Sequence, residues 1–177
     1  MQTYIALLRG INVGGHKKVP MAELRELLSK SGFENVKTYI QSGNVTFQSS
    51  KTDTNSLEKR IKSLILGEFG FEVPILVRTN QQLKMIFNNC PFSDVKKTES
   101  YFVLLSESPS KKNIDEVSAK TYPDDTYIII NDCIYLHCAK GYGRSKFNLN
   151  YFERKLNVNA TARNYKTMVK LLSLSDI

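Results

Sequence analysis

Glycines and basic side chains occur together in two stretches of the chain, where a loop can hold an anion. The first stretch, Arg9–Lys18, reads RGINVGGHKK and contains no acidic residue. The second, Lys140–Lys146, reads KGYGRSK and places Arg144 and Ser145 beside two glycines. Backbone amides exposed at glycines, together with guanidinium and ammonium groups, bind phosphate and other anionic oxygens. Both stretches are therefore candidates for an anion site.

The first stretch is not a nucleotide-binding P-loop. The spacing from Gly10 to Gly15 matches that motif, but His16 and Lys17 follow where the motif requires Lys and then Ser or Thr. Ten residues is long for such a connection, and long ordered loops are often functional. The alternative is that the glycines serve only to turn the chain.

Two further stretches are polar and have a structural alternative. Gln41-Ser42-Gly43-Asn44 is typical of a hairpin turn, although its amide and hydroxyl groups can also line a polar site. Thr161–Thr167 reads TARNYKT, in which Thr161 or Asn164 is expected to cap the last helix. Arg163 at such a helix start favours a nearby anion or carboxylate, because the helix dipole is positive there.

The first half of the chain predicts the elements that position these stretches. A helix starts at Pro20 with an apolar stripe and closes at Gly32, and a second starts at an Asn55–Glu58 capping box and closes at Gly70. Strands are expected at 4–9, 37–41, 45–49 and 74–78. The order is the ferredoxin-like βαββαβ pattern, and we predict such a subdomain over residues 1–79.

The second half, residues 80–177, predicts a smaller α+β subdomain with basic C-terminal helices. Helices are expected at 81–89, 111–120, 147–156 and 165–174, and strands at 101–105, 127–130 and 134–138. The element order loosely echoes the first half, without a sequence repeat. The fold class is therefore α+β.

The charge of the chain is concentrated near its C-terminus. The formal net charge is +8, and residues 140–170 contain eight basic residues and a single acid, Glu153. Such a segment favours a negatively charged partner, with a solvated basic surface as the alternative. The three cysteines, odd in number and widely spaced, favour free thiols and a cytoplasmic protein.

Several functions are disfavoured by what the sequence lacks. No apolar stretch is long enough for a membrane helix, and two histidines are too few for a His-rich metal site. The strand at 44–48 lacks the paired exposed aromatics of an RNA-recognition module. We therefore expect no metal, no cofactor and no membrane partner.

Four motifs in this order resemble a bacterial family, the domain of unknown function 1697. They are Arg9–Gly15, Gln41–Val45, Gly143–Lys146 and Thr161–Thr167, and the resemblance spans almost the whole chain. It implies two α+β subdomains, the first of them ferredoxin-like. Members often carry Trp at the position of Tyr165, which keeps an aromatic side chain. The family brings no established activity, so the resemblance assigns no catalytic residue.

The leading hypothesis is a protein that binds a phosphate-bearing or other anionic ligand, such as a nucleotide, in a cleft between the two subdomains. Its predicted site residues are Arg9, Asn12, Gly14, Gly15, Lys17, Ser42, Asn44, Arg144, Ser145, Lys146, Arg163 and Asn164. One alternative is a nucleic-acid-binding protein that uses residues 140–170. Others are an enzyme with His16 or Ser145 as proton carrier, and a protein-interaction module.

Overall fold

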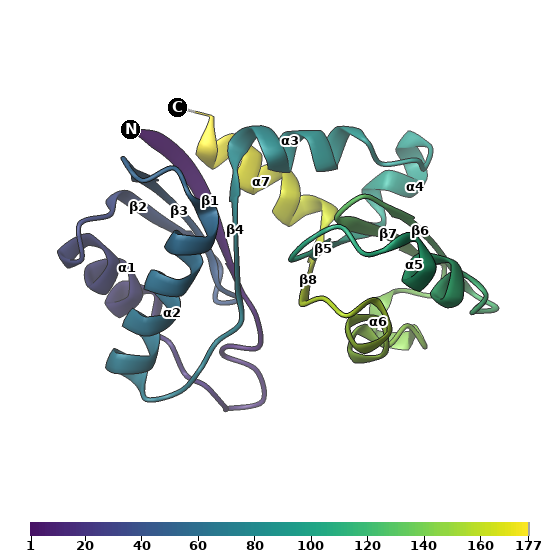
Figure 1. The fold of residues 1–177 in the computed structure, drawn as a ribbon, viewed down its shortest axis with the longest axis horizontal. Coiled ribbons are helices and arrows are strands. Elements are labelled where there is room, and N and C mark those ends of the chain that lie inside the picture. The colour runs from purple at the N-terminus through teal and green to yellow at the C-terminus, as the bar shows by residue number, and fades with distance from the viewer. Residues whose placement is uncertain (177) are drawn as a thin grey trace. The chain divides into compact units, whose positions relative to one another are not determined.

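The computed structural model describes residues 1–176. The chain forms two compact units (Figure 1). Unit 1 comprises Met1–Met85 and the residues from Val169 onward, and unit 2 comprises Ile86–Met168. Helices α3 (Asn80–Asn88) and α7 (Tyr165–Ser175) each begin in one unit and end in the other.

Unit 1 has the ferredoxin-like order predicted from the sequence. Its antiparallel sheet has the strand order β2-β3-β1-β4. The elements are β1 (Gln2–Leu8), α1 (Met21–Lys30), β2 (Glu34–Tyr39), β3 (Asn44–Ser49), α2 (Thr54–Phe69) and β4 (Ile75–Thr79).

The core of unit 1 lies between one face of this sheet and the helices α1 and α2 (Figure 1). Tyr4, Ala6 and Leu8 alternate along β1, so all three point to the helix-covered face. They pack in one cluster with Leu24 of α1 and Ile61 of α2. Gly70 ends α2 in the left-handed conformation, at φ +78°, as the sequence predicted.

The start of α2 differs from the prediction. Asp53, not Asn55, caps the helix, because its carboxylate accepts hydrogen bonds from the backbone amides of Asn55 (3.3 Å) and Ser56 (3.0 Å). The predicted capping box is therefore wrong. Glu58 instead accepts a hydrogen bond from the backbone amide of Val77 at 2.7 Å.

Unit 2 is a second α+β unit with an antiparallel sheet in the order β6-β7-β5-β8. Its strand β8 was not predicted, because the sequence assigned part of it to the lead-in of the last helix. The elements are α4 (Asp94–Thr98), β5 (Ser100–Leu105), α5 (Lys111–Ser118), β6 (Asp125–Ile130), β7 (Cys133–Cys138), the 3₁₀ turn η1 (Tyr142–Arg144), α6 (Leu149–Leu156) and β8 (Ala160–Asn164).

The two units repeat one arrangement. From β5 to β8, unit 2 has the same element order and strand order as unit 1 from β1 to β4. The register also matches, since Ile5 pairs with Arg78 in unit 1 and Phe102 pairs with Arg163 in unit 2. The first strands read TYIALL (3–8) and SYFVLL (100–105). Each unit is therefore a βαββαβ module with an arginine near the end of its last strand.

No helix among the described residues combines the length and apolar character that a membrane crossing requires.

Candidate functional site

The loop after β1 folds into a small exposed hairpin. The amide of Asn12 donates to the carbonyl of Lys17 at 3.1 Å, and the amide of His16 donates to the carbonyl of Val13 at 3.0 Å. Gly14 and Gly15 form its tip at φ +58° and +76°, and a Cβ added to Gly15 would meet nothing within 4 Å. The tip is therefore open to solvent, and its glycines are explained by the turn.

Asn12 fastens this hairpin to the rest of unit 1. Its Nδ2 donates to the carbonyls of Val19 (3.0 Å) and Gln41 (2.8 Å), while its Oδ1 accepts from the amide of Val19 at 2.8 Å. The side chain thus ties both ends of the loop to the turn before β3. Because its polar atoms are used inside the protein, we assign Asn12 to positioning the loop.

The Gln41–Asn44 turn is packed against the end of β1. A Cβ on Gly43 would lie 2.5 Å from the Cβ of Leu8 and 3.2 Å from its carbonyl oxygen, so only glycine fits there. Asn44 is fully buried and donates from Nδ2 to the carbonyl of Tyr39 (3.1 Å) and to Oγ of Ser42 (2.9 Å). Asn44 therefore organises the turn, and the loop and the turn meet on one surface.

The same turn contains a strained residue. Ile40 has φ +50° although its side chain is branched at Cβ, and the residue is 52% exposed. A β-branched residue in the left-handed region is an outlier that costs on the order of 1–2 kcal/mol. Because Ile40 is largely exposed, little free energy from burying its side chain offsets this cost. Strained residues of this kind cluster at active sites, ligand clamps and switch regions.

The hairpin carries the positive charge of this surface. His16, Lys17 and Lys18 are exposed, and Arg9 is partly buried. The Nζ of Lys17 donates to the backbone carbonyl of Glu72 at 2.8 Å, which holds the ammonium group beside the loop. We call the surface formed by Arg9–Lys18 and Ile40–Asn44 the loop surface of unit 1.

The Arg144–Lys146 motif forms a turn in unit 2. Oγ of Ser145 donates to the Asp125 carboxylate at 2.8 Å and accepts from the amide of Phe147 at 2.9 Å. These bonds tie the turn to the start of β6, so they account for Ser145 structurally. Arg144 and Lys146 are exposed.

Arg163 lies in β8 and is only 8% exposed. Its Nη1 donates to Oγ1 of Thr161 at 2.7 Å and to the carbonyl of Ala162 at 2.8 Å. Burial lowers the pKa of Arg163 to about 10, so the side chain is still cationic at pH 7.

Asn164 caps α7 by accepting from the amide of Thr167 at 2.9 Å, which confirms one of the two expected caps.

The turn and Arg163 lie on different faces of the second sheet. Tyr142, in the 3₁₀ turn, stacks on Tyr101 with ring centroids 4.4 Å apart, and Tyr101 packs against the core cluster of unit 2. Arg163 pairs in register with Phe102, the residue after Tyr101. Consecutive strand residues point to opposite faces, so Phe102 and Arg163 lie on the face opposite Tyr101. The structure therefore does not join these two groups of predicted site residues.

The basic segment is less positive than its sequence indicates. Lys140 pairs with Asp124 at 2.9 Å, and Lys155 pairs with Glu116 at 2.9 Å. Arg163 is buried. These contacts reduce the exposed charge with which the segment can contact a polyanion.

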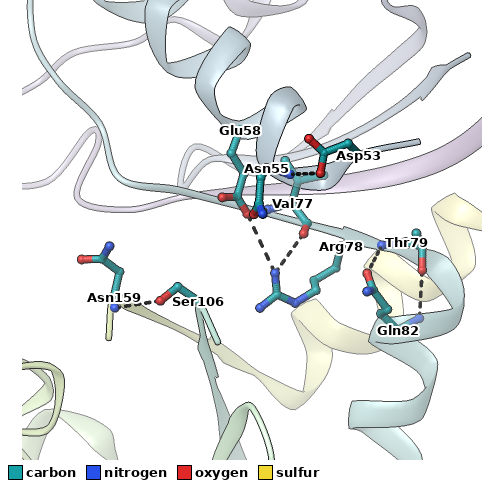
Figure 2. Close-up of polar contacts among 9 residues, drawn as sticks. All are labelled: Asp53, Asn55, Glu58, Val77, Arg78, Thr79, Gln82, Ser106 and Asn159. Atoms are coloured by element: carbon teal, nitrogen blue, oxygen red, sulfur yellow. Dashed lines mark hydrogen bonds and ion pairs between the residues drawn. The ribbon is translucent and has the colours of Figure 1, made fainter. Parts of the chain in front are cut away.

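Sequence reasoning missed a partly buried ion pair in unit 1, between Glu58 and Arg78. Besides accepting from the amide of Val77, Oε1 of Glu58 lies 3.9 Å from Nη1 of Arg78 (Figure 2). Burial raises the pKa of Glu58, and its hydrogen bond from Val77 and the charge of Arg78 oppose that rise. Glu58 lies 19 residues before Val77, whose amide it binds, so this contact leaves no local sequence signal.

Among residues 1–176, no group of three or more His, Cys, Asp or Glu side chains could hold a metal ion. Cys133 and Cys138 are buried free thiols, and burial raises the pKa of both. Raised thiol pKa values make them poor nucleophiles.

The fold and the loops define a class of α+β proteins made of two units, of which the first is ferredoxin-like. Within this class, the chain belongs to the DUF1697 family of proteins of unknown function, whose model matches residues 1–135. The loop surface of unit 1 lies inside the matched residues, and Arg144–Lys146 and Arg163 lie outside them.

Three chains of known structure match this one. One of them is described as the structure of conserved bacterial protein SP0830 from Streptococcus pneumoniae. It is 24% identical in sequence, with a TM-score of 0.75 over 99% of each chain, so it supports the fold alone. No curated protein matches the chain.

Proposed function

We propose that the loop surface of unit 1 binds a phosphate-bearing or other anionic ligand. The observation that carries this proposal is the hairpin Arg9–Lys18, which has no acidic residue, is exposed over residues 13–18 and is held in place by Asn12. The backbone amides at the glycine tip would contact the anion oxygens, and Lys17 and Lys18 would neutralise their charge.

The three hydrogen bonds of Asn12 support a preorganised site. A loop fixed before binding loses little conformational entropy when the ligand arrives. The strained turn at Ile40 lies next to the Gln41 carbonyl that Asn12 holds, so the same fastening maintains both segments.

The alternatives have less support from the contacts. A nucleic-acid-binding function of residues 140–170 must rely on fewer exposed charges, since Lys140 and Lys155 are paired and Arg163 is buried. A proton-carrying role of Ser145 competes with its hydrogen bonds to Asp125 and to the amide of Phe147. His16 remains a candidate proton carrier on the loop surface itself.

Calorimetric titration of the full chain with tripolyphosphate tests the proposal. We expect saturable binding that weakens at least about tenfold in the Lys17→Ala/Lys18→Ala double variant, because charge-assisted contacts are worth about 1.5–3 kcal/mol each. The matched control is Lys84→Ala, an exposed lysine of unit 1 on α3. Equal affinity in the double variant and the control would remove the loop surface as the site.

A further inference from the structure

Within residues 1–176, the two sheets have four edge strands, β2, β4, β6 and β8. An edge strand presents unpaired backbone amides and carbonyls, which makes it a template for pairing with another strand. Folded proteins protect such edges with bulges, charged side chains or covering segments. Comparing the four edges shows which one is left open.

The edges of unit 1 are protected. Strand β2 has a register shift between Glu34 and Lys37, so it combines an irregular backbone with charged side chains. On β4, the side chain of Glu58 accepts from the amide of Val77, and Nη1 of Arg78 donates to the carbonyl of Val77 at 2.9 Å (Figure 2). Side chains thus occupy both outward-facing groups of Val77.

The edge strand β8 of unit 2 is protected in the same way. The carboxylate of Glu153 accepts from the amide of Ala160 at 2.7 Å, and Nη1 of Arg163 donates to the carbonyl of Ala162 at 2.8 Å. In both units, therefore, the last strand has a glutamate on an outer amide and an arginine on an outer carbonyl.

Strand β6 has no comparable protection. Within the described chain, no side chain or loop forms a hydrogen bond to the backbone of Thr126–Ile130 outside its pairing with β7. The strand reads DTYIII, and its one charged residue, Asp125, is engaged by Ser145. Thr126 is exposed and Ile128 is 38% exposed.

A surface pocket of about 420 Å³ runs along this edge. It is lined by most of β6, by Ser118 at the end of α5, and by the connection that precedes β6, including Lys120 and Tyr122. The ammonium of Lys120 lies 3.9 Å from the ring centroid of Tyr151. Lys120 is therefore held over this ring and does not extend across the edge of β6. Side chains of an added strand can enter the pocket.

We propose that β6 pairs antiparallel with β6 of a second copy of this chain. Pairing centred on Ile128 places Ile128 against its own copy, Thr126 against Ile130, and Tyr127 against Ile129. Asp125 then faces the uncharged Asn131, so no like charges oppose each other along the strand. From Thr126 to Ile130, apolar or uncharged side chains therefore face each other along the paired strands, and because the strand fits its own copy in this two-fold symmetric register, we take a second copy of this chain as the occupant.

The pairing joins two copies of the sheet of unit 2 into one continuous sheet. The contact is one short strand per chain, which is below the area of a standard stable interface. The dimer is therefore weak, and its population rises with protein concentration.

Sedimentation velocity of the full chain over a range of concentrations tests the proposal. We expect the wild type to shift towards dimer as concentration rises, and Thr126→Lys and Ile128→Lys to stay monomeric. Thr126 is exposed, so its substitution cannot disturb the core. The control is Val95→Lys on α4, where the replaced side chain is 73% exposed and lies outside β6; it should dimerise like the wild type.

Cross-linking supplies a second, independent readout. Facing residues of a non-hydrogen-bonded antiparallel pair lie within the Cα separation of a disulfide. Mild oxidation of an Ile128→Cys variant should therefore give a covalent dimer, and a Val95→Cys variant should not. A wild type that stays monomeric at every concentration, with no excess cross-linking at position 128, overturns the proposal.

Discussion

Replacing Asn12 by Ala should destabilise unit 1 by about 2–4 kcal/mol. The change removes three hydrogen bonds, of 3.0, 2.8 and 2.8 Å. Each contributes a net amount of about 0.5–1.5 kcal/mol, with the bond to Gln41 at the low end because it is exposed. Asn12 also has φ +56°, a conformation that asparagine adopts more readily than alanine, and this adds to the cost.

Asn35→Ala is the matched control. Asn35 also has a positive φ, +51°, but its side chain is exposed and donates a single hydrogen bond, to Gln48 at 2.6 Å. The free-energy cost of holding alanine in the left-handed conformation is therefore common to both substitutions. The difference between them, about 1–3 kcal/mol, isolates the hydrogen bonds that fasten the loop.

Urea denaturation followed by circular dichroism gives the free energy of unfolding of each variant. An Asn12→Asp variant, similar in size but without the amide donor, should be destabilised at pH 7 at least as much as Asn12→Ala. If Asn12→Ala costs no more than Asn35→Ala, the loop is not held by this side chain, and the argument for a preorganised surface fails.

Three further predictions concern the same unit. Gly43→Ala should cost at least about 2–3 kcal/mol of unfolding free energy, because the added Cβ would meet Leu8 at 2.5 Å. Gly14→Ala should cost only about 1 kcal/mol in the same chemical denaturation assay. Equal costs for the two substitutions would contradict the close packing at Gly43. Ile40→Asn should raise stability by about 1 kcal/mol, seen as a higher Tm, and a lower Tm would show that the turn is not strained. For Glu58, the raised pKa means that its contribution to stability is full below the ordinary value of 4.5 and is lost as pH rises through the folded-state pKa. Glu58→Gln should therefore gain stability relative to the wild type in urea titrations as pH rises above 4.5, and an unchanged difference would refute the burial argument.

Local sequence patterns predicted most of the elements. The apolar run of β1, the alternation of Val45 and Phe47 in β3, and the left-handed Gly70 after α2 are set by neighbours within a few residues. The order of these elements was enough to predict the fold of unit 1.

Strand β8 could not be predicted from such patterns. Ala160, Ala162 and Asn164 have low β propensity, and the strand exists because it pairs with β5. Without it, the element order of unit 2 did not match that of unit 1. The predicted cap at Asn55 failed for a different reason, since Asp53, two residues earlier, is an equally good cap residue.

The candidate site was predicted as residue types but not as contacts. The bond from Asn12 to Gln41 spans 29 residues, and no local pattern indicated that the loop and the turn meet. Asn12, Asn44 and Ser145 suit a ligand site by type, yet their side chains bond within the protein. Only the folded chain distinguishes a polar residue that positions a loop from one that faces solvent.

The most direct test of the proposed function is an NMR titration of the ¹⁵N-labelled chain with inorganic phosphate. Binding at the loop surface predicts saturable shifts of the backbone amide signals of Gly14 and Gly15, and a much smaller response in the Lys17→Ala/Lys18→Ala variant. Shifts that leave these two glycines unmoved, or that map to residues 140–170 instead, would contradict the account.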